Sequence, residues 1–99
     1  MKYTKHTLKK TELLLEEIGY VIRYEKGSFQ SGYAVVQKRK IAVINKFFDT
    51  EARINCLFDI IAAVEVDTAR LSDKSVKFYN QMEQNKAEEA QLLERQIST

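Results

Sequence analysis

The sequence predicts a small α+β fold in which a three-stranded antiparallel meander is packed by helices, in the order α-β-β-β-α-α. Two observations support this prediction: apolar residues recur at helical spacing toward both ends of the chain, and three short runs between them alternate as strands do. Because 99 residues leave room for one core, we expect a single domain over residues 1–83 and a helical tail over residues 84–99.

The first expected helix covers residues 5–18. Its apolar side chains recur at helical spacing, and Thr4 or Thr7 can cap its first turn. Gly19 fits the left-handed position that ends many helices. Residues 20–26 alternate between two sets of side chains and are rich in aromatic and β-branched residues, so they are predicted to form the first strand.

Two further strands are expected over residues 33–37 and 41–45. Only the charged turn Lys38-Arg39-Lys40 separates them. An antiparallel hairpin is the connection that fits, because a parallel one needs a dozen or more residues. Both side-chain sets of these strands are apolar, so both faces of the sheet are expected to need cover.

The second expected helix begins at Asp49 or Thr50, either of which can cap it, and runs to about Val64. Its polar residues fall on one narrow stripe, and the rest of its circumference is apolar. Such a helix is buried on more than one side. We therefore expect the segment from Gly32 to Val66, hairpin and helix together, to form the centre of the fold.

The third expected helix begins at the Ser72-Asp73 pair. Beyond Met82 its apolar positions thin out, and charged residues interrupt any heptad, so a coiled coil is not supported. We expect residues 84–99 to be helical but frayed, or ordered by a partner.

Composition and charge narrow the class of protein. The chain is 44% apolar and 30% charged and holds one cysteine, so no internal disulfide can form. It shows no apolar region typical of a signal peptide and no stretch of membrane length, which favours the cytoplasm and no membrane partner. Residues 1–48 hold ten Lys/Arg against four Asp/Glu, and residues 49–99 hold six against ten. This asymmetry favours contact between the halves or with a charged partner.

Few residues could carry chemistry. His6 is the only histidine and sits in the first turn of an exposed basic helix, without a positioned partner. Cys56 lies between apolar neighbours, where a thiol acts as a small hydrophobe. Asp49 and Glu51 are explained by the start of a helix, and Asp59 by its solvated stripe. We therefore predict no catalytic residue, no cofactor, no metal site and no small-molecule ligand, and hence no enzyme.

An aromatic and basic set on the predicted sheet and its loops is the strongest candidate for a binding surface. We call it the aromatic–basic set, and its members are Tyr24, Lys26, Phe29, Tyr33, Lys38, Arg39 and Lys40. Aromatic platforms edged by cations bind single-stranded nucleic acid. The same tyrosines also fit the sheet side of a hydrophobic core, and both interpretations stay open at this point.

Four short runs carry a resemblance to a known family. They are residues 24–29 (Tyr-Glu-Lys-Gly-Ser-Phe), 31–33 (Ser-Gly-Tyr), 43–46 (Val-Ile-Asn-Lys) and 53–55 (Arg-Ile-Asn). Over residues 5–80 the chain resembles a family of short bacterial proteins of unassigned function. The resemblance implies a compact domain that recurs as a stand-alone protein, and it brings no activity with it.

A second, fainter likeness involves residues 32–66, where a strand hairpin leads into a helix. This segment resembles zinc peptidases of the ImmA/IrrE type, whose helix carries Arg-Phe-x-x-Ala-His-Glu-x-x-His. Phe58, Asp59 and Ala62 stand where the first zinc histidine, the general-base glutamate and the second histidine would be. Both metal ligands are replaced, so the likeness implies a degenerate scaffold without its catalysis.

The leading hypothesis is a small non-enzymatic interaction or scaffold protein that self-associates as a homodimer or docks on a protein partner. It rests on a surplus of apolar surface without a catalytic set. Single-stranded nucleic-acid binding through the aromatic–basic set is one alternative, and a degenerate peptidase-like domain is another.

Overall fold

The computed structural model describes residues 1–27 and 32–97, so Phe29 of the aromatic–basic set lies outside the described residues. Its helices and strands are α1 (Lys5–Glu17), β1 (Val21–Glu25), β2 (Tyr33–Val36), β3 (Ile41–Asn45), α2 (Thr50–Ala63) and α3 (Asp73–Ile97), with short 3₁₀ turns η1 (Gln37–Arg39) and η2 (Thr68–Arg70). The α+β class and the predicted order of helices and strands are confirmed. In the described part of the chain, no helix is long and apolar enough to cross a membrane.

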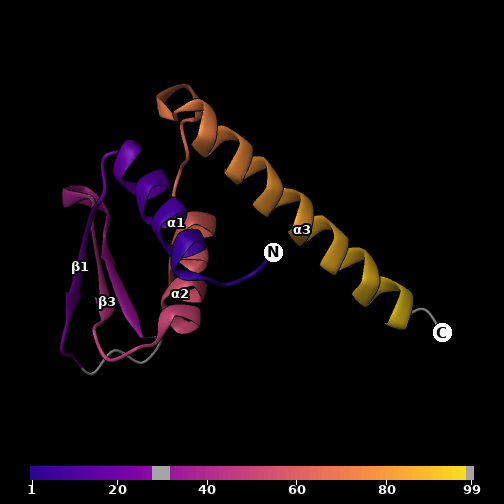
Figure 1. Ribbon diagram of the computed structural model, residues 1–99, viewed down its shortest axis with the longest axis horizontal. Helices are drawn as coiled ribbons and strands as arrows, with labels where there is room; N and C mark the ends of the chain where they lie inside the picture. The colour runs from indigo at the N-terminus through magenta and orange to yellow at the C-terminus, as the bar shows by residue number, and fades with distance from the viewer. Residues whose placement is uncertain (28–31, 98–99) are drawn as a thin grey trace.

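The elements form three layers (Figure 1). The sheet is the first layer, α1 and α2 pack side by side on one of its faces, and α3 begins against α1 and runs diagonally away from both layers. As a 25-residue helix, α3 is about 37 Å long, in a molecule whose longest axis measures 43 Å. Its C-terminal half therefore runs well past the other two layers.

The predicted antiparallel meander was wrong. The sheet is mixed and ordered β1-β3-β2, with β1 parallel to β3 and β2 antiparallel to it. The β2–β3 hairpin itself is antiparallel, as predicted. β3 takes the centre because Ala42 and Ile44 give it a fully buried face, whereas β1 carries the exposed polar residues Arg23 and Glu25, which suit an edge.

The connection between β1 and β2 is long enough for this strand order. Seven residues separate the two strands. Fully extended they reach about 23 Å, and stepping over one central strand needs only about 10 Å. The sequence therefore permits either neighbour for β1, and burial decides between them.

The core lies between the inner face of the sheet and the two helices on it. Its fully buried side chains include Leu14, Leu15, Ala42, Ile44, Leu57 and Ile60. α2 contacts α1 and β3, and its Phe58 ring lies 6.4 Å from the Phe78 ring of α3, measured between centroids. α2 is thus buried on more than one side, as its apolar circumference predicts.

The C-terminus of α1 is held by two cations from distant parts of the chain. Gly19 ends the helix with a φ of 96°, and the Tyr20 amide donates to the Leu15 carbonyl at 2.9 Å. The Ile18 carbonyl accepts from Lys40 Nζ at 3.3 Å and from Arg70 Nη1 at 3.4 Å. Positive charge is favourable there because the carbonyl end of a helix is negative.

A substitution at Gly32 tests the close contact between this residue and the Phe48 ring. Its φ is 83°, and a Cβ at this position would collide with the Phe48 ring. A Gly32→Ala variant should lose about 1–3 kcal/mol of unfolding free energy more than Gly19→Ala, because Gly19 shares the positive φ but leaves room for a methyl group at 3.4 Å from Lys40 Cδ. Urea unfolding measures both, and equal losses would show that Phe48 does not close over Gly32.

Candidate interaction surfaces

The fold separates the members of the aromatic–basic set. Tyr24 and Tyr33 flank Ile44 in the sheet, and their half-buried side chains pack on the core, on the face that carries the helices. Lys38 and Arg39 lie exposed in η1, at the opposite end of the strands. The aromatic rings and these cations therefore do not share one surface.

The two remaining basic members lie apart as well. Lys26 is exposed just beyond the end of β1. Lys40 is at the other end of the sheet, where a left-handed φ of 51° turns it toward the carbonyl of Ile18 at the end of α1. Its ammonium group is thus engaged by the end of α1, although the residue itself is exposed.

Tyr24 belongs to a contact network that joins α1, β1 and α2. Its hydroxyl donates to the Glu12 carboxylate, and the Arg53 guanidinium lies over its ring at 4.4 Å from the centroid. Arg53 also donates from Nε to the Phe48 carbonyl at 2.9 Å and from Nη2 to the Lys46 carbonyl at 2.7 Å. These polar groups hold the start of α2 to the sheet.

Burial and the hydrogen bond to Glu12 raise the pKa of the Tyr24 phenol well above its ordinary value of 10.0. The phenol is thus neutral and acts as a hydrogen-bond donor at physiological pH.

The residues aligned with the peptidase motif form no metal centre. Phe58 is half-buried and meets the Tyr3 ring edge-on at 5.8 Å between centroids, while Asp59 and Ala62 are exposed. Burial, with a smaller contribution from Asp59, raises the pKa of the Cys56 thiol. Among the residues that the structure describes, no three His, Cys, Asp or Glu side chains come together as metal ligands could.

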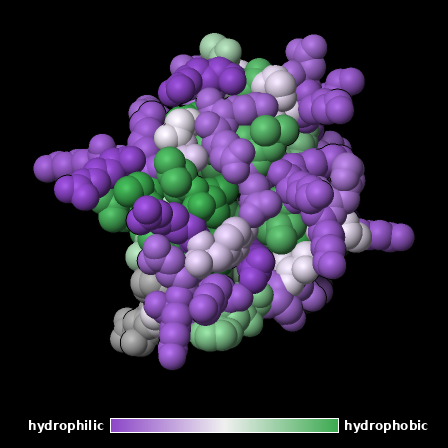
Figure 2. Space-filling view, turned by 60° about the vertical axis from the view of Figure 1, so that its left-hand side comes forward, coloured by the Kyte–Doolittle hydropathy of each residue, from purple (hydrophilic) through white to green (hydrophobic). Residues whose placement is uncertain are grey.

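The outer face of the sheet carries an apolar patch. The strand register places five apolar side chains on this face beside the polar Arg23, Glu25 and Asn45, and we call the five the outer sheet patch: Val21, Ala34, Val36, Ile41 and Val43. None of them belongs to the hydrophobic cluster formed by the described residues, and Val21 and Val36 are about half exposed. Figure 2 brings this side of the molecule forward and shows green side chains gathered between purple ones.

The second half of α3 is an exposed helix. We call residues 84–97 the α3 tail. Every side chain of residues 86–96 is exposed, including the large apolar ones of Leu92 and Leu93, which are 56% and 58% exposed. The sequence predicts that this segment is helical but frayed, or ordered by a partner. In the structure it continues α3 to Ile97.

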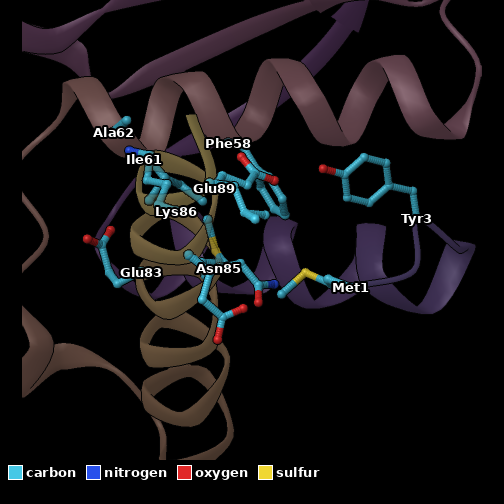
Figure 3. Close-up of a pocket in the computed structure, with 12 residues that line it drawn as sticks. Met1, Tyr3, Phe58, Ile61, Ala62, Glu83, Asn85, Lys86 and Glu89 are labelled. Atoms are coloured by element: carbon cyan, nitrogen blue, oxygen red, sulfur yellow. The ribbon is translucent and has the colours of Figure 1, made fainter. Parts of the chain in front are cut away.

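A groove of about 310 Å³ opens where the α3 tail diverges from α2 (Figure 3). Phe58 and Ile61 of α2 form one wall with Met1 and Tyr3, and Asn85 and Lys86 of α3 lie opposite. Its charged lining residues are Glu83, Lys86, Glu88 and Glu89, so this groove has an acidic rim.

A second groove, of about 520 Å³, lies between α1 and the first half of α3. We call it the basic groove, and it is lined by His6, Lys9, Lys10, Leu13, Lys74, Ser75, Lys77, Phe78 and Gln81. Phe78 is only 5% exposed and forms an apolar floor, beside which Leu13 is 42% exposed. Four lysines and no carboxylate line it, so it is suited to an acidic ligand with an apolar side.

The sequence did not predict the basic groove. Its lysines come as two pairs, Lys9 with Lys10 and Lys74 with Lys77, from segments more than sixty residues apart. Each pair by itself is an ordinary solvated helix face, and only the packing of α1 on α3 brings the two together.

Comparison of the chain with protein-family models, curated proteins and solved structures found no match. The surfaces described above are therefore interpreted from their own geometry and chemistry.

The raised pKa of Tyr24 predicts a dependence of stability on pH. Because folding favours the neutral phenol, its contribution is complete below the ordinary pKa of 10.0 and is lost as the pH rises above that value. Tyr24→Phe should cost about 1 kcal/mol of unfolding free energy at neutral pH, and the difference from wild type should shrink in alkaline solution. Urea titrations at about pH 8 and about pH 11 test this.

The control is Tyr3→Phe, which removes a hydroxyl from a 38% exposed side chain. Its difference from wild type should stay constant over the same pH range. A constant difference for Tyr24→Phe as well would contradict the role given to the Glu12 contact.

Proposed function

We propose that this chain is a non-enzymatic interaction protein whose docking element is the α3 tail. The observation that carries the proposal is the exposure of every side chain of residues 86–96 in a continuous helix. Most of the stability of a helix in a protein comes from tertiary packing of its apolar face, and the exposed residues of the tail lack such packing within their own domain. A partner that covers Leu92 and Leu93 would provide the missing stabilisation.

Self-association is the simplest form of this function. The chain keeps two apolar surfaces outside its core, the outer sheet patch and the leucines of the α3 tail. Apolar surface left uncovered on a small domain is typical of a protein interface. A homodimer needs no second gene product, and its interface contains the same patch from both copies.

The alternatives have less support from the geometry. Nucleic-acid binding through the aromatic–basic set would need exposed rings beside the cations, whereas Tyr24 and Tyr33 face the helices. The degenerate peptidase-like scaffold stays a prediction from the resemblance alone.

Capture of bound protein by the full tagged chain, with and without nuclease, tests the proposed function. Leu92→Gln combined with Leu93→Gln should weaken protein capture by at least about tenfold, because it removes two apolar anchors while glutamine keeps the helix propensity. A second copy counts as bound protein in this measurement.

Phe47→Gln is the matched control, because Phe47 is 69% exposed and lies outside α3. It should leave capture unchanged. Equal capture by wild type and the double leucine variant, or bound material that disappears with nuclease, would contradict the proposal.

A further inference from the structure

The two halves of α3 differ in charge. The first half contributes Lys74 and Lys77 to the basic groove, where Lys9 and Lys10 of α1 face them. From residue 83 onward the helix is acidic, with Glu83, Glu88, Glu89 and Glu94 against Lys86 and Arg95. One molecule thus carries both a basic groove and an acidic helix with exposed leucines.

Both features lie on one stripe of α3. The residues Lys74, Phe78, Gln81, Asn85, Glu88 and Leu92 follow one another at alternating intervals of four and three. Residues at this spacing share a face of a helix. The wall of the basic groove therefore continues into the α3 tail through Glu88 and Leu92.

We propose that the basic groove binds the α3 tail of a second copy of this chain, in a reciprocal antiparallel pair. The inference rests on the proposed function and names the partner of the same docking element. Positions 78 and 92 are equidistant from Asn85, so two antiparallel α3 helices that cross at Asn85 bring Leu92 of each copy to Phe78 of the other. Glu88 then enters a groove with four lysines and no carboxylate.

The apolar parts of the two surfaces also match. Leu13 is 42% exposed at the side of the groove and Leu92 is 56% exposed on the tail, so docking covers both and adds apolar contact to the Phe78 floor. Lys10 Nζ lies 6.0 Å from the Phe78 ring centroid, at the mouth of the groove, where an incoming carboxylate can reach it. Apolar contact supplies affinity, and the charges fix the antiparallel orientation.

A nucleic-acid strand fits this groove less well than an acidic helix. Nucleic acid bound by lysines without sequence preference also stacks its bases on exposed aromatic rings. Phe78, the aromatic residue of the groove, is only 5% exposed and offers no open ring face. The apolar floor instead suits an aliphatic side chain such as that of Leu92.

Analytical ultracentrifugation of the full chain over micromolar concentrations, at low and high salt, tests the proposal with two charge-reversed variants. The groove variant is Lys9→Glu, Lys10→Glu, Lys74→Glu and Lys77→Glu together, and the tail variant is Glu88→Lys with Glu89→Lys. Wild type should dimerise, more weakly at high salt. Each variant alone should dimerise about tenfold or more weakly, because like charges then face each other.

Mixing the two variants gives the decisive result. The acidic groove of one then faces the basic tail of the other, and the unchanged groove and tail face each other at the second site. The mixture should therefore form heterodimers with an affinity close to that of wild type. A merely structural effect of the substitutions would not be rescued by mixing.

A third variant, Val21→Lys with Val36→Lys, keeps the test falsifiable and should dimerise like wild type. A dimer that only this variant disrupts would overturn the proposal and place the interface at the outer sheet patch. The proposal would also be overturned if a monomeric wild type bound a fluorescent single-stranded oligonucleotide and the groove variant did not. A monomeric wild type whose tail still captures another protein would overturn the second-copy partner while leaving the proposed function standing.

Discussion

The packing of α1 and α2 against one face of β3 is the interaction on which the rest of this structure depends. It buries Ala42 and Ile44 completely and forms the hydrophobic core of the residues that the structure describes. A domain of this size has few elements with which to cover apolar surface. Since both available helices lie on the inner face, the outer sheet patch is left without cover from the described core. α3 completes the third layer with its first half only.

Local signals in the sequence predicted most of the elements and failed where a long-range choice decides. Thr4 caps α1, Gly19 ends it, and Asp49 accepts from the Ala52 amide at 2.9 Å, as capping rules predict. The predicted strand order was wrong because the parallel pairing of β1 with β3 depends on which strand is buried best. Residues adjacent in the sequence give no information on the relative burial of distant strands. The alternation of side chains along β1 defines two faces of the strand but does not indicate which face the helices cover. The sequence therefore left open whether Tyr24 faces the core or the solvent.

The difference between local signals and long-range packing also explains why the candidate surfaces in the structure differ from the aromatic–basic set predicted from the sequence. The aromatic–basic set was assembled from neighbours in sequence, and the fold directs its tyrosines inward. The basic groove is assembled from α1 and α3 and depends on how these helices pack. Part of this packing is polar, because Glu17 accepts from the Ser72 amide at 2.8 Å. Desolvation raises the pKa of the Glu17 carboxyl, but its hydrogen bonds with Ser72 and Ser75 outweigh this and lower the pKa. This contact fixes the start of α3 beside the end of α1.

We propose that the helical α3 tail is stabilised by a second copy of this chain and not by its own domain. Hydrogen exchange of the α3 amides, compared between dilute and concentrated protein, tests it most directly, because exchange reports local opening segment by segment. Stabilisation by a second copy predicts slow exchange for residues 73–82 at every concentration, and exchange over residues 84–97 that slows as the concentration rises. Exchange of residues 84–97 that is equally slow at all concentrations, or equally fast, would contradict it.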